Sequence, residues 1–365
     1  MQASISLQKT AKKVRQEALR LGYQMQQGSL GISLGLFMRG MHFLVDSNRE
    51  TPPGEAFKLL RSRYFELLER DLHNAEQGIY PIELLFQFPL KEYAKQLPEL
   101  LADMPRTAMR RRHSNYTDLP EGIPRERYPA YYARNFHWQT DGWLSERSAA
   151  LYAASVELLF QGTADIMRRM AIPPLMEHFK TFNPKEGPAR ILDIACGTGR
   201  FLQQLQQALP DEKFYGIDLS PYYIARAKQN LGHIQDIALL TENAEQMPFQ
   251  DASFDAITSV FLFHELPKDA RRRVVSEIKR VLKPNGLVVI CDSVQLSDSA
   301  PLKPFLDRFE ALYHEPYYRS YLRDDLAQML GEFGFQILSN EPCYLSKIVA
   351  GRLGDTIPSL SKELQ

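Results

Sequence analysis

Residues 191–201 read ILDIACGTGRF, and this stretch decides how the rest of the chain is interpreted. An apolar run ends in Asp193 and passes through a turn that contains Gly197 and Gly199. Residues 200–209 then have the pattern of an amphipathic helix. A buried strand, a tight turn and a helix in that order form a ligand-binding corner at the carboxyl end of a strand. The sequence therefore predicts a ligand site here.

The composition is that of an ordinary globular protein. The chain has 365 residues, of which 44% are hydrophobic, and 44 basic residues balance 44 acidic ones. Because there is no overall positive field, we expect no nucleic-acid partner. Cys196, Cys291 and Cys343 are odd in number and widely spaced, which favours a reducing compartment, and no signal-peptide pattern precedes them. We expect a cytoplasmic protein, and the spacing of its histidines, cysteines and carboxylates indicates no metal site.

Residues 1–140 show helical periodicity and no strand pattern, which predicts an all-helical N-terminal domain. The most apolar early stretch, residues 30–45, is short for a bilayer span and contains Arg39 and His42, so membrane contact is not indicated. A second helix is expected to start after residues 51–54 and to end near Gly78. The first helix carries an apolar stripe at alternating spacings of four and three, too short for a confident coiled coil, and we expect it to pack on neighbouring helices. The stripe consists of Leu7, Ala11, Val14, Ala18, Leu21 and Met25.

Two segments before the sheet region are open to more than one interpretation. Residues 105–134 are rich in arginine: they either face an acidic or phosphate-bearing partner or form an irregular solvated connection, and the neutral chain favours the connection. Residues 141–185 are expected to form a helical linker, in which Ser145 is a possible N-cap of a helix. Trp138 and Trp143 either line a substrate cavity or seal the interface between the two parts of the chain.

Residues 186–352 alternate strand and helix patterns, which predicts a doubly wound, mostly parallel sheet of α/β class. Two final strands around Glu341-Pro342 suit an antiparallel hairpin, which brings the sheet to seven strands, and residues 353–365 form a tail. The predicted strands are residues 190–195, 213–218, 237–240, 254–261, 287–291, 335–339 and 343–350. The predicted helices are residues 200–209, 221–230, 269–282 and 324–333.

The residues around the glycine turn narrow the choice of ligand. A dinucleotide site needs a third glycine where this chain has Leu202, and a phosphate loop needs a lysine where it has Arg200. Asp193 before the turn would repel a pyrophosphate but favour an ammonium or sulfonium group. The ligand is therefore expected to carry a positive charge.

Residues at two further places predict that the ligand also contains a nucleoside. Asp218 ends the second predicted strand 19 positions after Gly199, where a carboxylate can accept hydrogen bonds from both hydroxyls of an unphosphorylated ribose. Asn243 and Ala244 follow the third strand, where an amide and backbone groups can read an adenine edge. Ribose, adenine and a cationic amino-acid tail together describe S-adenosylmethionine.

Four segments in order resemble the class I S-adenosylmethionine-dependent methyltransferases, in particular the subgroup related to the ubiquinone and menaquinone C-methyltransferases. They are ILDIACGTGRF, YGIDLS, NAEQMPFQDASFDAITSVFLFHEL and EIKRVLKPNGLVVICD, within residues 186–350. The resemblance implies that the first motif contacts the methionine moiety, that Asp218 holds the ribose and that Asn243 with Ala244 flanks the adenine. Asn243 stands where the family usually has aspartate. The residues assigned to the cofactor are Asp193, Ala195, Gly197, Thr198, Gly199, Asp218, Leu219, Asn243, Ala244 and Phe261.

Methyl transfer to a hydroxyl or phenol benefits from a general base. His264 follows the fourth predicted strand and is the candidate base or substrate-orienting group; alternatively it only closes a turn. Residues 300–322 form an aromatic insertion on the substrate side, where Tyr317 and Tyr318 are candidate lid and acid–base residues and where the rest suits an ordinary helix core. His314 lies in the same insertion.

Three functions remain open from the sequence. The first is transfer of a methyl group from S-adenosylmethionine to a small or lipophilic aromatic, quinone-like acceptor. The second is methylation of a protein side chain, with the N-terminal helices docking the protein substrate. The third is a non-catalytic assembly factor, against which the retained turn glycines and ribose carboxylate argue.

Overall fold

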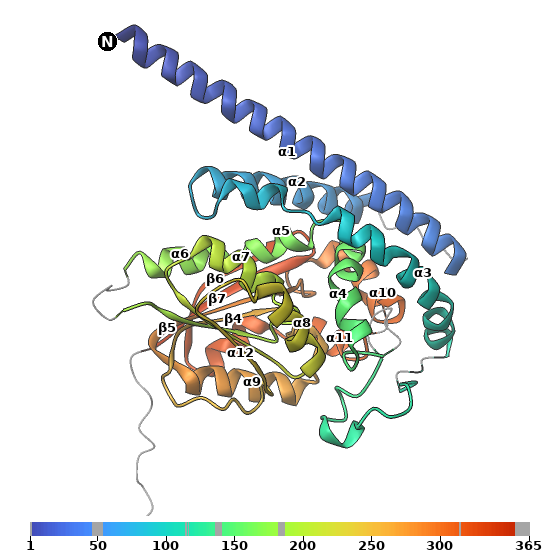
Figure 1. The fold of residues 1–365 in the computed structure, drawn as a ribbon. Coiled ribbons are helices and arrows are strands. Elements are labelled where there is room, and N and C mark those ends of the chain that lie inside the picture. The colour runs from blue at the N-terminus through green and yellow to red at the C-terminus, as the bar shows by residue number, and fades with distance from the viewer. Residues whose placement is uncertain are drawn as a thin grey trace, which may run out of the picture.

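A seven-stranded sheet in the order β3-β2-β1-β4-β5-β7-β6 organises the computed structural model (Figure 1). The structure describes residues 2–45, 54–113, 115, 117–135, 141–181, 187–313 and 315–354. Strands β1 to β5 pair in parallel, and β7 runs antiparallel between β5 and β6. The predicted fold class and terminal hairpin are confirmed. The strands are β1 (Arg190–Ile194), β2 (Lys213–Asp218), β3 (Ile237–Thr241), β4 (Phe254–Val260), β5 (Leu282–Ser293), β6 (Phe335–Cys343) and β7 (Ser346–Leu353).

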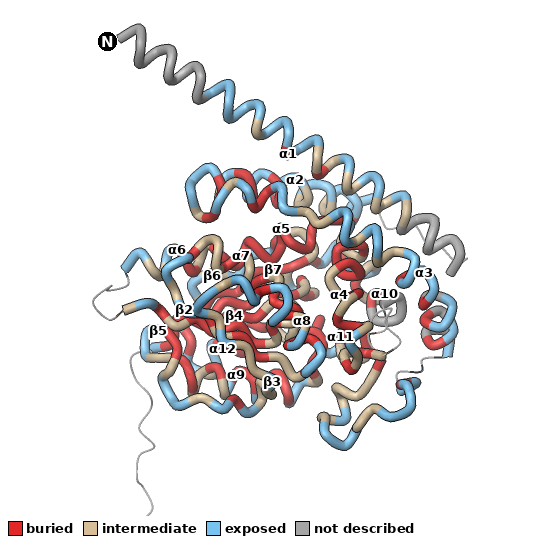
Figure 2. The backbone as a smooth tube through the Cα atoms, viewed as in Figure 1, coloured by how far each residue is buried: buried red, intermediate tan, exposed pale blue. Residues whose placement is uncertain are grey.

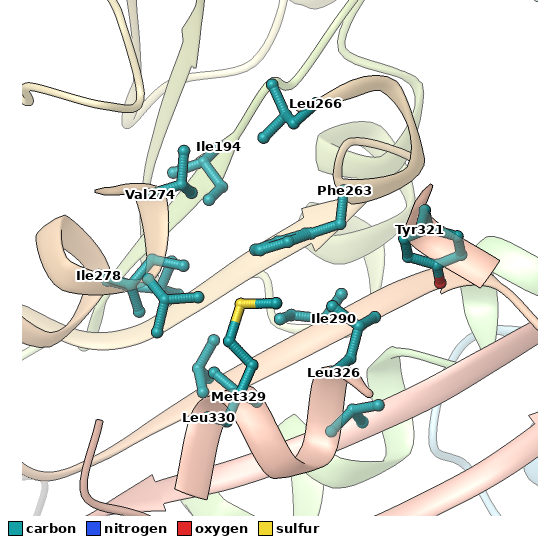
Figure 3. Packing of buried hydrophobic residues seen from close by; sticks show 14 of the residues in the cluster. Ile194, Phe263, Leu266, Val274, Ile278, Ile290, Tyr321, Leu326, Met329 and Leu330 are labelled. Carbon is teal, nitrogen blue, oxygen red and sulfur yellow. The ribbon is translucent and has the colours of Figure 1, made fainter. Parts of the chain in front are cut away.

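Helices cover both faces of this sheet because its central strands are apolar on both sides. On one face, Leu192 and Ile194 of β1 pack in a cluster with α9 (Lys268–Val281), α12 (Leu326–Glu332) and the insertion helices. Figure 3 shows Val274 and Ile278 of α9 in this cluster, together with Met329 and Leu330 of α12. The insertion helices are α10 (Lys303–Tyr313) and α11 (Tyr318–Leu322).

The other face carries Ile191 of β1 and a second apolar cluster. Four helices supply its cover: α5 (Ala164–Arg169), α6 (Ile172–Phe179), α7 (Arg200–Ala208) and α8 (Pro221–Leu231). Tyr23, Leu67 and Leu72 from the N-terminal helices belong to the same cluster, so those helices extend the core instead of forming a separate one. The domain boundaries at residues 140 and 185 stay predictions.

The N-terminal part begins with α1 (Gln2–Val45), followed by α2 (Gly54–Glu76), η1 (Ile82–Phe86) and α3 (Leu90–Arg112). The helix α2 lies between α1 and the sheet (Figure 1). Asp71 of α2 is fully buried and accepts hydrogen bonds from Tyr23 of α1 at 2.5 Å and from Tyr80 at 2.7 Å. Arg169 of α5 binds the same carboxylate through Nε at 2.8 Å and Nη2 at 2.5 Å. One carboxylate thus fastens both N-terminal helices to the sheet domain.

Three expectations about local structure need correction. The described part of the predicted stripe on α1 does not pack on neighbouring helices: Val14, Leu21 and Met25 are exposed, and the packed face carries Tyr23. The side chains of Leu7 and Ala11 lie outside the described residues. Figure 2 shows the exposed side of this helix. The arginine-rich segment is helical up to Arg112, because α3 continues through two prolines. β5 begins directly after α9, since the break at residues 283–286 forms a bulge inside the strand instead of a loop before it.

Ser145 caps α4 (Glu146–Leu159) as predicted, because its side chain accepts a hydrogen bond from the N–H of Ser148 at 3.0 Å. None of the described helices is long and apolar enough to cross a membrane. Trp138, His314 and residues 355–365 of the predicted tail lie outside the described residues.

Candidate active site

The turn after β1 is held by the carboxylate that ends β2. The N–H of Gly197 donates to Asp218 Oδ2 at 3.0 Å, and the N–H of Ser220 donates to Asp218 Oδ1 at 2.8 Å. Ala195 and Gly197 have φ of 55° and 56°, a left-handed backbone that is strained for alanine. This sharp turn opens space above the carboxyl end of the sheet.

A cavity occupies that space, at the carboxyl ends of β1, β2 and β4 and beside the loop after β3. Two of its lining residues, Asp218 and Asn243, are the predicted ribose and adenine contacts, and the Cβ position of Gly197 has room toward Tyr152 at 3.7 Å. The arrangement provides a carboxylate and an amide on one side and an aliphatic and aromatic wall on the other. The predicted cofactor residues that line this cavity are Ala195, Gly197, Asp218, Leu219, Asn243, Ala244 and Phe261.

Three other predicted cofactor residues lie next to the cavity but do not line it. Asp193 is buried under the turn, where it accepts a hydrogen bond from Thr258 Oγ1 at 2.8 Å. The carbonyl of Thr198 accepts from Asn230 at 2.9 Å. Gly199 begins α7 at φ 80°, and a Cβ there would lie 2.5 Å from Leu231 Cδ1. The structure gives these residues supporting roles in the turn and in the contact between α7 and α8.

Both aspartates of this corner are harder to ionise than in water. Burial raises the pKa of Asp193 to about 7, although its hydrogen bond from Thr258 acts in the opposite direction. Burial likewise raises the pKa of Asp218 to about 6, against the effect of the N–H donors of Ser220 and Gly197. The corner therefore holds two carboxyl groups that titrate close to neutral pH in the ligand-free protein.

Aromatic residues from before the sheet roof the cavity, and the sequence motifs did not indicate most of them. Trp143 packs edge-to-face with Tyr152 and Tyr223 at centroid distances of 5.6 and 5.7 Å, and all three line the cavity. Tyr131 and Tyr132 complete the roof, and Tyr131 donates a hydrogen bond to Glu245. Trp143 therefore lines the cavity of the predicted cofactor residues, whereas the interpretations of its sequence were a substrate cavity or an interface seal. The acidic-partner interpretation of the arginine-rich segment stays untested.

A second, smaller chamber adjoins the cofactor cavity and shares Tyr152, Phe261 and Glu265 with it. Its free volume is about 30 Å³, against about 100 Å³ for the cofactor cavity. Phe261 stands between the two spaces at φ 59° and stacks on Phe160 at 5.5 Å. The remaining residues that line the second chamber are Val156, Leu159, Phe160, His264, Ser293, Phe309, Glu315 and Tyr318.

His264 is the polar centre of the second chamber, surrounded by three carboxylates. Its Nδ1 lies 2.6 Å from Asp292 Oδ1, and its Nε2 lies 3.7 Å from Glu265 and 4.0 Å from Glu315. Burial alone would lower the pKa of His264, but Asp292 and then the two glutamates raise it to about 10. The imidazole is therefore protonated at neutral pH and is itself the cation that these carboxylates hold.

This arrangement changes the expected role of His264. A protonated imidazole cannot take a proton, but it can donate a hydrogen bond and stabilise a negative charge on a substrate oxygen. His264, Glu265 and Glu315 each offer one atom that could bind a metal ion, and these three atoms lie within 4.8 Å of one another. The spacing of the three residues in the sequence did not indicate this group. Asp292 and Glu315 were not identified from the sequence, because they reach His264 from β5 and from the insertion.

Tyr317 and Tyr318 of the insertion have different surroundings in the structure. Tyr318 lines the second chamber and shares a hydrogen bond of 2.8 Å with Ser293 Oγ, and burial raises its pKa far above the usual value for tyrosine. It is therefore suited to donating a hydrogen bond and not to acting as a base. Tyr317 does not line either chamber but contacts Tyr131 edge-to-face at 6.3 Å and lies under Arg134. It joins the insertion to the roof.

Comparison with known proteins identifies the corner as part of a methyltransferase domain. Residues 191–286 match the family model described as "Methyltransferase domain". A demethylmenaquinone methyltransferase of Thermotoga maritima is 33% identical over 189 residues, which cover 47% of this chain and 79% of that protein. An O-methyltransferase of Aspergillus nomiae is 34% identical over 153 residues, 41% of this chain and 65% of that protein. A demethylmenaquinone methyltransferase of Staphylococcus aureus is 33% identical over 125 residues, 34% of this chain and 49% of that protein.

Two solved structures are similar to part of this chain at low sequence identity. A Pyrococcus horikoshii protein is 19% identical with a TM-score of 0.40, over 51% of this chain and 89% of that one. Magnesium protoporphyrin IX methyltransferase from Synechocystis, solved with S-adenosylmethionine, is 15% identical with a TM-score of 0.38, over 53% of this chain and 83% of that one.

Proposed function

Because the chain belongs to the class I S-adenosylmethionine-dependent methyltransferases, we propose that it transfers a methyl group to a lipophilic aromatic, quinone-like acceptor. The observation that carries the proposal is the pair of adjoining spaces that share Tyr152, Phe261 and Glu265. One has the residues for a nucleoside with an amino-acid tail, and the other is lined largely by aromatic and aliphatic side chains. Two of the curated relatives, those of Thermotoga and Staphylococcus, carry the name of a quinone methyltransferase.

The residues of the first cavity fit S-adenosylmethionine. Asp218 would accept hydrogen bonds from the ribose hydroxyls, and Asn243 with Ala244 would flank the adenine. The open side of the turn at Gly197 would receive the methionine part. S-adenosylmethionine supplies a methyl group that its sulfonium has already activated. The protein must therefore mainly align the acceptor and exclude water.

The second chamber suits an aromatic ring that carries a hydroxyl group. Phe160, Phe261 and Phe309 offer aromatic faces, and His264 provides a charged donor among them. The chamber as it stands has too little free volume for a ring. Entry of the acceptor therefore requires that lining side chains, such as Phe309 of α10, move outward.

We assign the protonated His264 to holding the acceptor oxygen. Its positive charge lowers the cost of forming a phenolate, and a phenolate is the better nucleophile at oxygen or at the ring carbons. Glu265 lines both spaces and is the carboxylate placed to take the phenol proton. Tyr318 would donate a second hydrogen bond from the opposite wall.

The test uses the purified full chain, S-adenosylmethionine with a labelled methyl group, and a cell extract separated into lipid and protein. We expect label in the lipid fraction, on an aromatic product heavier by one methyl group. His264→Gln should lower kcat at least tenfold while leaving S-adenosylmethionine binding by calorimetry unchanged. Asp218→Ala should lose that binding and serves as the cofactor-site control. Label found only on protein would replace this proposal with protein methylation.

A further inference from the structure

The helix α1 displays an apolar stripe that faces away from the rest of the chain. Val14, Leu21, Met25, Ile32 and Leu36 are 59% to 67% exposed, and Ala18 between them is exposed as well. At about 100° per residue, these six positions fall within about 60° of arc. Tyr23, Gln27 and Leu34, which face the body of the protein, lie on the opposite side of the helix.

The spacing of the stripe is that of a coiled-coil seam. Residues 14 and 21 occupy d positions and residues 18, 25 and 32 occupy a positions of a heptad pattern, in which Gly28 and Gly35 take the next two d positions, and the stripe is narrow. A strict a/d stripe marks contact with another helix, whereas a helix that lies on a membrane has a broader apolar face. Lys13 and Arg20 lie about 110° and 130° around the helix from the middle of the stripe, outside its apolar face.

We propose that this stripe pairs with the same stripe of a second copy of the chain, as an antiparallel two-stranded coiled coil. The five large side chains expose roughly 600 Å² per copy, so pairing would bury about 1,200 Å² in total if all of this area were covered, the lower bound for a stable interface. That area comes from side chains that otherwise lie in water.

The shape of the molecule favours the antiparallel direction. Residues 13–18 are all exposed and belong to the part of α1 that projects away from the body as it runs toward the N-terminus, whereas residues 19–37 lie closer to the body (Figures 1 and 2). If the α1 helices of two copies cross near residues 18–21, the part before the crossing in one copy lies along residues 19–37 of the other copy. Ala18 then faces Leu21 of the second copy, and Val14 faces Met25.

A parallel pair would be less favourable for two reasons. It would place both protein bodies at the same end of the coiled coil. It would also bring the basic segments that contain Lys13 and Arg15 side by side, and like charges repel. The antiparallel pair keeps both the bodies and these segments apart.

Sedimentation velocity of the full chain tests the proposal. We expect the wild type at twice the chain mass of 42.0 kDa. Leu21→Glu with Met25→Glu should sediment as a monomer. The matched control, Gln16→Glu with Ser33→Glu, changes two exposed positions of α1 off the stripe and should remain a dimer. Circular dichroism and calorimetric S-adenosylmethionine binding check that both variants are folded.

A cysteine experiment tests the direction. Ala18→Cys lies near the crossing point and should form an interchain disulfide on mild oxidation, whereas Ile32→Cys should not. The natural cysteines are buried and do not interfere. A monomeric wild type, or a Leu21→Glu/Met25→Glu variant that stays dimeric, overturns the proposal. A monomeric wild type that floats with anionic phospholipid vesicles would assign the stripe to a lipid surface instead. Cross-linking through Ile32→Cys would overturn the antiparallel direction.

Discussion

At the residue scale, Asp193 buries a carboxyl group beneath the turn, with Thr258 as its hydrogen-bond donor. Its folded-state pKa of about 7 lies above the ordinary value of 3.8. The protonated form therefore contributes stability that is present at low pH and is lost as the pH rises through about 7. The ligand-free protein must ionise a buried group above that pH.

Asp193→Asn should consequently stabilise the ligand-free protein at pH 8, because the amide stays neutral. We expect a gain on the order of 1–3 kcal/mol at pH 8 and little change at pH 4, measured by urea unfolding. Asp211→Asn, at an exposed position, is the control and should stay within about 0.5 kcal/mol of the wild type at both pH values. Parallel stability profiles for the wild type and Asp193→Asn would contradict the burial argument.

His264 provides a second prediction, which depends on its contact with Asp292. In the wild type the imidazole should remain protonated up to about pH 10, and its stabilising contribution, fully present below about pH 6.5, should disappear as the pH rises through 10. In Asp292→Asn the nearest carboxylate is gone while burial still disfavours the charge, so the pKa of His264 should fall, although Glu315 and Glu265 still raise it. NMR titration of the labelled imidazole measures both values. Titration of wild-type His264 near pH 6.5 would exclude the charged-donor role.

At the element scale, Gly199 determines how closely α7 and α8 approach. Gly199→Ala adds a Cβ 2.5 Å from Leu231 Cδ1 at a φ of 80°. We expect a loss of about 2–4 kcal/mol, of which about 1 kcal/mol is the left-handed backbone and the rest is overpacking. In the background of Leu231→Ala the same substitution should cost only the backbone part. Urea unfolding of the four proteins in this cycle measures the coupling, and equal costs in both backgrounds would locate the strain elsewhere.

The sequence predicted those features that depend on a pattern within a single strand, helix or turn. The strand and helix patterns after residue 186 predicted the sheet, and the glycine turn with Asp218 predicted the cofactor corner, because strand ends in a parallel sheet converge on one edge. It could not predict which face of α1 is covered, since apolar residues lie on its exposed side and Tyr23 and Gln27 on its buried side. The environment of His264 was equally inaccessible, because Asp292 and Glu315 reach it from distant segments.

At the scale of the whole molecule, one buried contact connects the N-terminal helices to the sheet domain. Asp71 of α2 is the shared acceptor for Tyr23, Tyr80 and the guanidinium of Arg169. The carboxylate raises the pKa of Arg169 well above its usual value, against the effect of burial, so the arginine is a charge that depends on this partner. A buried charge that loses its partner is far more costly than an exposed one.

Asp71→Asn should therefore destabilise the protein by about 3–5 kcal/mol, because it leaves the Arg169 guanidinium buried without a counter-charge. Asp71→Asn combined with Arg169→Met should cost less than Asp71→Asn alone, since the second substitution removes that charge. Glu341→Gln is the control, because it breaks an exposed ion pair with Arg70. The side chains of Arg70 and Glu341 are 43% and 61% accessible, so this substitution should cost at most about 1 kcal/mol. Urea unfolding gives the three values, and limited proteolysis should show faster cleavage of the N-terminal helices in Asp71→Asn. If Asp71→Asn proved as stable as Glu341→Gln, the N-terminal helices would have to be held by their apolar contacts and by other polar contacts, such as those of Arg63 with Asp298 and Ser299.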